Sequence, residues 1–174
     1  MPEIVYYVAA SVDGFIATPD GGVDWLSPFE GGDDDYGYRG FLAGVDAILI
    51  GRTTYEQILT FGDWPYGGKN SWVFSHRKLP VVAEEITVTS EMPTEVASML
   101  DIAGVNGAGL VGGGELAGSF ARAGLITRYI ISVMPVLLGH GVRLLGSQRA
   151  SGELVLESTA RMGEVVQNVY RTLW

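Results

Sequence analysis

A glycine and an arginine, Gly51 and Arg52, directly follow the apolar run of residues 47–50. Thr53 and Thr54 come next, and the pattern after them predicts that a helix begins here. The first turn of a helix has unpaired backbone N–H groups and the positive end of the helix dipole, and a glycine lets a ligand approach the main chain. A guanidinium adds a charge that suits phosphate. The segment is a candidate anion site, although a turn glycine beside a solvated arginine has the same sequence.

A second cationic segment lies at Ser75, His76 and Arg77, just after the strand-like residues 71–75, and Lys78 follows it. The chain has a formal net charge of −9 and only two lysines, so this positive segment stands out against an acidic background. Two interpretations remain open, namely a solvated turn and a site for one phosphate group.

Three consecutive glycines, Gly112, Gly113 and Gly114, precede Glu115 and a predicted helix. Glycines permit positive φ angles and expose successive N–H groups, so such a turn can wrap closely around a diphosphate. The pattern is not GxGxxG, and no acidic residue suited to binding a ribose follows about 20 residues later. The glycines therefore indicate a phosphate site but disfavour a conventional Rossmann domain.

Short apolar runs alternate with helical patterns along most of the chain. This alternation predicts a mostly parallel sheet covered by helices, and two final strands separated by Gly163 predict an antiparallel hairpin at the edge of the sheet. We therefore expect a mixed α/β sandwich in a single domain over residues 1–174. Strands are expected at residues 4–10, 47–50, 71–75, 86–89, 108–111, 128–133, 153–159 and 165–173, and helices at residues 36–45, 53–60, 93–103 and from the glycine run to residue 122.

Each of the three segments rich in glycine or cations follows a predicted strand. Open parallel sheets bind ligands at the carboxyl ends of their strands, where loops lead into helices. Segments that meet along one such edge can hold an extended phosphate ligand together. A dinucleotide is the obvious candidate.

The composition disfavours several classes of function. A net charge of −9 and a pI near 4.6 argue against nucleic-acid binding, which needs clustered cations. With no cysteine and two histidines, neither a cysteine nucleophile nor a metal site is expected. No apolar run reaches the roughly 20 residues of a membrane span, so we expect a cytoplasmic protein without a membrane partner. The mean hydropathy of +0.23 is high, and apolar terminal strands predict a homodimer.

Five segments, which keep their order over nearly the whole chain, are similar to those of a known family. They are ASVDGFIA (residues 10–17), VDAILIGRTTYE (45–56), WPYGGKNSWVFSHRK (64–78), GLVGGGELAGSFARAGLI (109–126) and PVLLGHGVRLL (135–145). The family is the dihydrofolate reductase-like family, and the branch that the chain most resembles is the C-terminal reductase domain of the bifunctional riboflavin-biosynthesis deaminase-reductase. The resemblance implies a three-layer sandwich with an eight-stranded mixed sheet and NADPH as hydride donor.

The resemblance also implies a cofactor contact for each of the three segments. The pyrophosphate and a neighbouring phosphate would be held by Gly51, Arg52, Thr53 and Thr54. The adenosine 2′-phosphate would meet Ser75, His76 and Arg77, a set that favours NADPH over NADH. The diphosphate and the nicotinamide ribose would lie over Gly112, Gly113, Gly114 and Glu115, with the nicotinamide near Ala10.

Asp13 is the candidate catalytic residue. Hydride transfer usually needs a positioned acid, and Asp13 is the carboxyl best placed by motif, in the turn Ser11-Val12-Asp13-Gly14. We expect it to orient the substrate or to relay a proton. The alternative is an Asp-Gly turn in which the carboxylate caps the backbone.

Two departures from the family's pattern leave the substrate open. Val111 stands where riboflavin-branch reductases typically have a glutamate. Asp33, Asp34 and Asp35 precede a predicted helix, where they can contact a ring or cap the helix, and capping is favoured. The aromatic residues that are candidates for a flat-ring pocket are Trp25, Phe29, Tyr36, Tyr38, Trp64 and Tyr66.

The leading prediction is an NADPH-dependent reductase of an unidentified small heterocyclic or ribosyl substrate. Two alternatives use the same fold. One is a nucleotide-binding module without turnover, and the other is a protein that binds a flavin or a pterin instead of NADPH.

Overall fold

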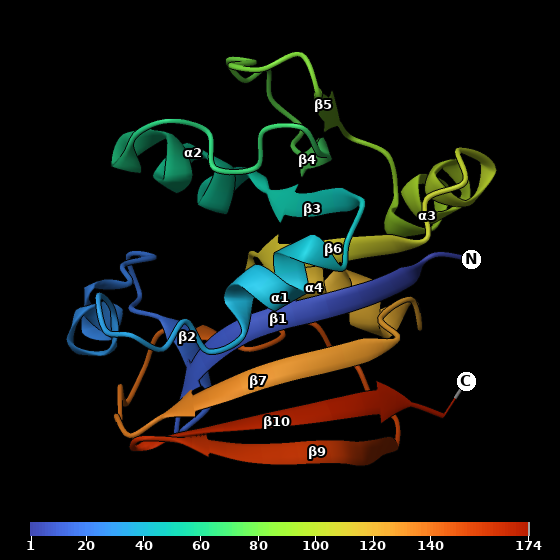
Figure 1. The fold of residues 1–174 in the computed structure, drawn as a ribbon. Coiled ribbons are helices and arrows are strands. Elements are labelled where there is room, and N and C mark those ends of the chain that lie inside the picture. The colour runs from blue at the N-terminus through green and yellow to red at the C-terminus, as the bar shows by residue number, and fades with distance from the viewer. Residues whose placement is uncertain (174) are drawn as a thin grey trace.

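Strand β1 (Glu3–Ser11) lies inside an eight-stranded sheet in the computed structural model, which describes residues 1–173 (Figure 1). The strand order is β5-β4-β3-β6-β1-β7-β10-β9. The first six strands of this order run parallel, and β10 is antiparallel to both β7 and β9. The other strands are β3 (Ala47–Gly51), β4 (Asn70–Phe74), β5 (Ile86–Thr89), β6 (Gly107–Gly112), β7 (Arg128–Met134), β9 (Leu154–Met162) and β10 (Val165–Thr172).

Helices cover both faces of this sheet. Successive side chains along a strand point to opposite faces, so both faces carry apolar side chains that the helices bury. Tyr6 of β1 lies in the core that the sheet forms with α3 (Pro93–Ile102) and α4 (Gly114–Arg122). Its neighbour Val5 lies in the core on the opposite face, with residues of α1 (Tyr38–Ala43) and α2 (Arg52–Phe61). The result is a three-layer sandwich, with the hairpin of β10 and β9 at one edge (Figure 1).

The predicted mostly parallel sheet and its antiparallel terminal pair are confirmed. The helix predicted at residues 36–45 is shorter, because Tyr36 has a φ of 54°, outside the helical region, and Gly44 caps the end. Three short elements were not predicted, since runs of two to six residues show little periodicity. They are β2 (Phe15–Ala17), β8 (Val142–Arg143), which pairs with β2, and the 3-10 helix η1 (Asp24–Phe29).

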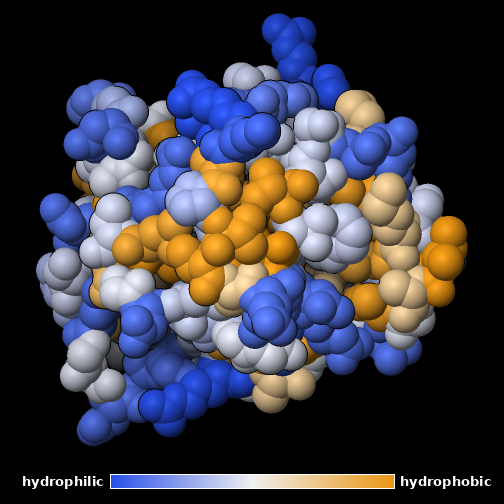
Figure 2. All heavy atoms as spheres, turned by 90° about the horizontal axis from the view of Figure 1, so that it is seen from above, coloured by the Kyte–Doolittle hydropathy of each residue, from blue (hydrophilic) through white to orange (hydrophobic). Residues whose placement is uncertain are grey.

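The surfaces at the two ends of the sheet carry exposed apolar side chains. Phe61 is the last residue of α2, and Val81 and Val82 lie between β4 and β5, elements in the upper part of Figure 1; all three are exposed. Seen from above, apolar side chains gather in the middle of that face, with hydrophilic ones around them (Figure 2). At the opposite end, Leu154 and Leu156 of β9 are exposed. Within residues 1–173, no helix has both the length and the apolar character needed to cross a membrane.

Candidate functional site

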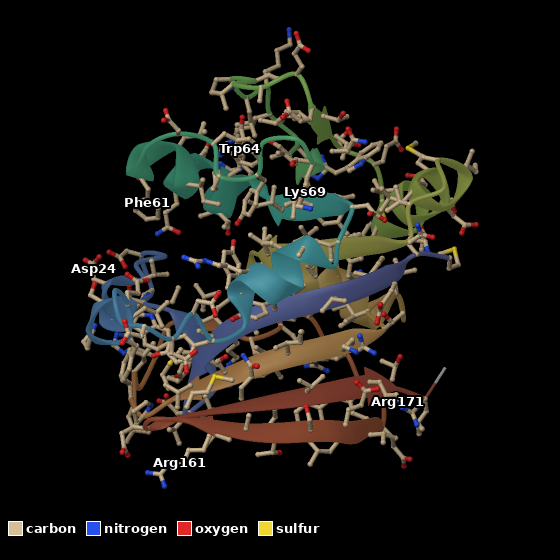
Figure 3. All side chains as sticks on the ribbon, viewed as in Figure 1. Asp24, Phe61, Trp64, Lys69, Arg161 and Arg171 are labelled. Carbon is tan, nitrogen blue, oxygen red and sulfur yellow. The ribbon has the colours of Figure 1, made fainter. Side chains whose placement is uncertain are left out.

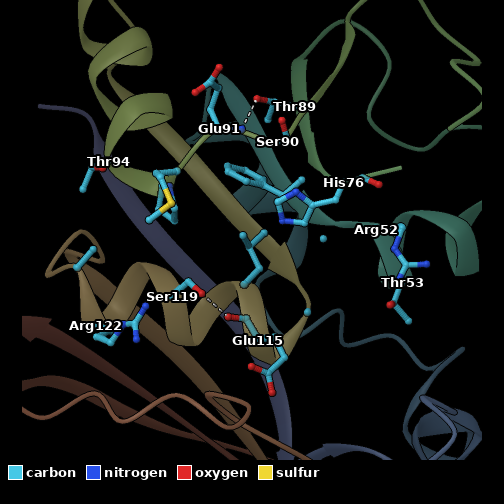
Figure 4. A pocket seen from close by; sticks show the side chains of 18 residues that line it. Arg52, Thr53, His76, Thr89, Ser90, Glu91, Thr94, Glu115, Ser119 and Arg122 are labelled. Carbon is cyan, nitrogen blue, oxygen red and sulfur yellow. Dashed lines mark hydrogen bonds between the residues drawn. The ribbon is translucent and has the colours of Figure 1, made fainter. Parts of the chain in front are cut away.

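The three segments rich in glycine or cations meet at one pocket, as the sequence predicts. The pocket has a volume of about 590 Å³ and lies at the carboxyl ends of β3, β4 and β5 and at the start of α4 (Figure 4). Seven of the predicted cofactor-binding residues line it: Gly51, Arg52, Thr53, Ser75, His76, Gly113 and Glu115. We call this cavity the first pocket.

Main chain forms the narrow part of the first pocket, where Gly51 and Gly113 face each other. A Cβ atom added to Gly51 would lie 3.9 Å from the Cα atom of Gly113, and one added to Gly113 would lie 3.7 Å from the Cα atom of Gly51. Gly113 has a φ of 91°, a conformation that side chains disfavour. Because both glycines line the pocket, a ligand there meets the backbone at the start of both α2 and α4, where N–H groups are unpaired.

Three predicted residues lie beside this narrow part and serve packing instead. A Cβ atom on Gly112 would clash with the side chain of Thr54, so these two residues fill each other's space. A Cβ atom on Gly114 would lie 2.5 Å from the carbonyl oxygen of Arg143. Thr54, Gly112 and Gly114 are absent from the lining of the first pocket, and only Gly113 of the glycine run is exposed to it.

Three side chains that carry or can gain positive charge line the first pocket from different elements (Figure 4). Arg52 comes from the first turn of α2, and its guanidinium lies 3.7 Å from the Glu56 carboxylate in an i,i+4 pair. His76 follows β4, and Arg122 comes from the last turn of α4. Sequence reasoning missed Arg122, although its position seven residues after Glu115 places both on one side of the helix.

Arg77 does not line the first pocket. Its backbone N–H donates to the Ser75 hydroxyl at 3.0 Å, and that hydroxyl donates to the Arg77 carbonyl at 2.9 Å. The Ser75 hydroxyl is therefore engaged in a local turn, and the Arg77 side chain is exposed outside the cavity. Of the predicted 2′-phosphate contacts, the structure brings His76 and Ser75 to the pocket and not Arg77.

The carboxylate of Glu115 anchors a neighbouring loop. It accepts hydrogen bonds from the Ser147 backbone N–H at 2.7 Å, the Ser147 hydroxyl at 2.9 Å and the Gln148 side-chain amide at 3.2 Å. The Ser147 N–H is the main reason that the pKa of Glu115 lies below its usual value. In Figure 4 this carboxylate points away from His76 and Arg52, so its charge is directed away from the cations.

The carboxylate of Asp13 is capped by three hydrogen bonds, one from a side chain and two from the backbone. It accepts hydrogen bonds from the Ser11 hydroxyl at 2.6 Å, the Leu138 N–H at 3.1 Å and the Gly139 N–H at 2.7 Å. The Ser11 hydroxyl is the largest cause that lowers the pKa of Asp13 to about 2. An ionised, capped carboxylate is a poor proton donor at neutral pH, so the geometry favours the turn-capping alternative. Ala10 is buried in β1 and lines neither pocket.

A second pocket of about 340 Å³ lies at the ends of β1 and β7, beneath the segment before α1. Tyr7 and Ala9 of β1 and Ser132 and Met134 of β7 line the sheet side of this pocket. Of the aromatic candidates, Phe29, Tyr36 and Tyr38 line it. Tyr7 was missed because strand periodicity alone does not show which side chain faces a cavity.

The remaining aromatic candidates lie elsewhere. Trp64 packs edge-on against Tyr55 of α2 and against Tyr66, with ring centroids 5.4 and 5.1 Å away (Figure 3 labels Trp64). These rings belong to the core under α2, and Trp25 is absent from the second pocket's lining. Trp64 and Tyr66 therefore have a packing role in this core.

Asp34 and Asp35 cap the backbone before α1, as favoured from the sequence. Asp35 accepts hydrogen bonds from the N–H groups of Gly37 and Arg39, both at 3.0 Å, and Asp34 accepts one from the N–H of Tyr36 at 2.8 Å. The Arg39 N–H is the largest cause that lowers the pKa of Asp35. Both aspartates also line the second pocket, so they give it negative charge.

The comparisons with known proteins show the family and the fold of the chain. The sequence pattern of the RibD C-terminal domain matches residues 2–168. The chain belongs to the RibD C-terminal domain family. Among relatives in this family, YwjB of Bacillus subtilis (strain 168), an uncharacterized protein, is 35% identical over 97% of both chains. RibD of Mycobacterium tuberculosis, a riboflavin biosynthesis protein, is 33% identical over 82% of this chain and 44% of its own length.

Solved structures of the RibD C-terminal domain family share the fold. A protein from Shewanella sp. PV-4 assigned to riboflavin biosynthesis has a TM-score of 0.88 and 26% identity, over 99% of both chains. A deaminase/reductase of Thermotoga maritima has a TM-score of 0.77 and 11% identity, over 98% of this chain and 56% of its own. The predicted dihydrofolate reductase-like fold and the riboflavin-branch resemblance are confirmed, and the family indicates an oxidoreductase.

Proposed function

We propose that the protein is an NADPH-dependent reductase that transfers a hydride to a small heterocyclic substrate. The observation that carries the proposal is the first pocket, where a backbone cradle at Gly51 and Gly113 lies between Arg52, His76 and Arg122. Its volume of about 590 Å³ falls within the range of about 300–1,000 Å³ that is usual for ligand sites. Bound NADPH would supply the hydride.

The residues present fit such a cofactor. Gly51 and Gly113 both line the pocket without a side chain, so a diphosphate there would meet the backbone at the starts of α2 and α4. Arg52 offers a guanidinium beside the first turn of α2. We assign the 2′-phosphate to His76 and Arg122, because these two line the pocket and Arg77 does not.

The second pocket supports catalysis over simple nucleotide binding. It lies at the ends of β1 and β7, which continue the same parallel sheet edge from which β3, β4 and β5 open into the first pocket. A binding module needs one cavity, whereas a reductase needs a cofactor site and a substrate site. The chain's own contribution at the second pocket is to position a ring and to keep water from it. We assign no proton transfer to Asp13, because its carboxylate is capped.

Fluorescence titration with NADPH and NADH tests the proposal. We expect NADPH to bind at least about tenfold more tightly than NADH. Arg122→Ala should remove most of this preference, because the 2′-phosphate would lose a cation. Arg161→Ala is the matched control, since Arg161 is exposed on the outer hairpin, away from the pocket (Figure 3). Equal binding of both nucleotides, or none of either, would contradict the proposal.

We also propose that two copies of the chain form a homodimer. Support comes from the edge strand β9, along which Leu154 and Leu156 are exposed, together with Val166 of β10. Leu156→Glu should shift the sedimentation of a dimer toward that of a monomer. A wild-type protein that sediments as a monomer at all concentrations would refute the dimer.

A further inference from the structure

Aromatic rings form much of the wall of the second pocket. Tyr7, Phe29, Tyr36 and Tyr38 all line it. The ring of Tyr7 stacks on that of Phe41 with centroids 4.8 Å apart, and its centroid lies 5.5 Å from that of Tyr38. A cavity of about 340 Å³ with such walls favours a flat ring over a flexible chain.

The segment that closes the pocket is fixed to the sheet. The carbonyl oxygen of Tyr36 accepts hydrogen bonds from the Tyr7 hydroxyl and from the Gln167 side-chain amide, each at 2.7 Å. The Tyr36 hydroxyl in turn donates to the Phe29 carbonyl at 3.0 Å. Tyr36 has a φ of 54°, which non-glycine residues rarely adopt without support from their surroundings. The pocket is therefore formed before a ligand enters, which lowers the entropic cost of binding.

All the charged side chains that line the second pocket are acidic, namely Glu30, Asp34 and Asp35. Asp35 is ionised at neutral pH, because two backbone N–H groups lower its pKa. Arg39 lies close enough to lower that pKa further, but it is not part of the lining. Within residues 1–173, the lining contains no lysine, arginine or histidine. A phosphate in this pocket would meet like charge without a cation to offset it.

We infer that the second pocket binds a flat ring that carries no phosphate and is neutral or positively charged, with N–H groups directed at the carboxylates. The inference rests on the proposed function in one respect, since it takes this ring as the hydride acceptor. The Thermotoga maritima protein is named a 5-amino-6-(5-phosphoribosylamino)uracil reductase, and such a substrate carries a phosphate. The acidic lining here fits a different substrate class.

Riboflavin and FMN are a matched pair of probes, because they share a flat ring and differ by one phosphate. Each is titrated by fluorescence with the first pocket saturated by NADP⁺. We expect riboflavin to bind at least about tenfold more tightly than FMN. Proflavine, a flat cation with amino groups, should bind more weakly as salt is added. FMN binding that equals or exceeds riboflavin binding overturns the inference.

A double variant, Glu30→Gln with Asp34→Asn, assigns the effect to this pocket. Both changes remove charge, and the amide that replaces the Asp34 carboxylate still offers an oxygen to the N–H of Tyr36. The difference between riboflavin and FMN should shrink to less than about threefold. Asp33→Asn is the control, because Asp33 is a neighbouring acid outside the lining, and it should leave the difference unchanged. A difference that persists in the double variant overturns the inference.

The outcomes separate this inference from the proposed function. If NADPH binds but neither riboflavin nor proflavine does, the inference fails and the cofactor assignment stands. If NADPH and NADH both fail to bind, the probes are titrated without NADP⁺; discrimination as expected then means that the pocket's preference stands and the proposed function fails.

Discussion

The two pockets are lined by different kinds of chemical groups. Backbone at Gly51 and Gly113, two arginines and a histidine form much of the first pocket, although the chain as a whole is acidic. Aromatic rings and carboxylates form the second. The first is suited to phosphates and the second rejects them, so one sheet edge can hold a phosphate-rich cofactor beside a phosphate-free ring without the two competing.

The pockets also differ in how far apart their residues lie in the sequence. Apart from Arg122, the residues assigned to the cofactor in the first pocket belong to local motifs, each just after a strand. The second depends on Tyr7, Tyr36 and Gln167, which β1, the loop before α1 and β10 bring together. Side-chain changes in the first pocket should therefore act mainly on cofactor affinity, and changes in the second on substrate binding and stability.

The largest effect is expected at the backbone cradle of the first pocket. Gly113→Ala places a side chain at a φ of 91°, which costs about 1–3 kcal/mol, and it should weaken NADPH binding by more than about a hundredfold. Gly51→Ala is sterically allowed, since the nearest atom lies 3.7 Å away, so it should not lower Tm. It should weaken NADPH binding about tenfold, because Gly51 lines the first pocket. Gly67→Ala, in open space, is the control. Wild-type affinity in Gly51→Ala would refute the close approach of a ligand.

A smaller effect is expected at Gln167, and it should act on stability and riboflavin binding instead of on NADPH binding. Its amide donates to the Tyr36 carbonyl and to the Ser132 hydroxyl at 2.9 Å, and it is buried. Gln167→Leu removes the donor to the buried Ser132 hydroxyl and leaves the Tyr36 carbonyl with the Tyr7 hydroxyl alone, and should lower the free energy of unfolding by about 1–3 kcal/mol. Riboflavin binding should weaken with it, while NADPH binding stays unchanged. Asn168→Leu, on the same strand with an exposed hydrogen bond to Thr159, is the control for denaturant titration. Equal losses in both variants would contradict a specific role for Gln167.

The difference in sequence separation between the two pockets explains which parts of the structure the sequence predicted. Strand ends, helix starts and the pattern around Gly51 and Gly113 are local, so the sheet and the first pocket followed from periodicity and turn chemistry. Arg122 was missed because it reaches the pocket from the far end of a helix. The second pocket was not predictable as a unit, because Tyr7 and Gln167 look like ordinary strand residues and meet at the Tyr36 carbonyl only in the folded chain.

A modest, pH-dependent effect is expected at Asp13, which holds the turn after β1 against residues 138 and 139. Its pKa is lowered from 3.8 to about 2, so its ionised form stabilises the fold above pH 3.8, and this stabilisation is lost as pH falls toward 2. Asp13→Asn should lower Tm by a few degrees at pH 7, and thermal melts should show that the difference from wild type shrinks between pH 4 and pH 2. Hydride transfer at saturating NADPH should change by less than about threefold. A hundredfold loss of rate at unchanged Tm would restore Asp13 as a catalytic residue.

The smallest effect is expected at Arg77, which is next to His76 in the sequence but outside the first pocket. Because its contacts to Ser75 are made by backbone atoms, Arg77→Ala keeps the turn and removes only an exposed charge. The preference for NADPH over NADH should change by less than about twofold, whereas Arg122→Ala should remove most of it. Both ratios come from the same fluorescence titration. A larger loss in Arg77→Ala than in Arg122→Ala would mean that the 2′-phosphate is bound by Arg77, the sequence neighbour of His76. It would not then be bound by Arg122, which lines the first pocket with His76.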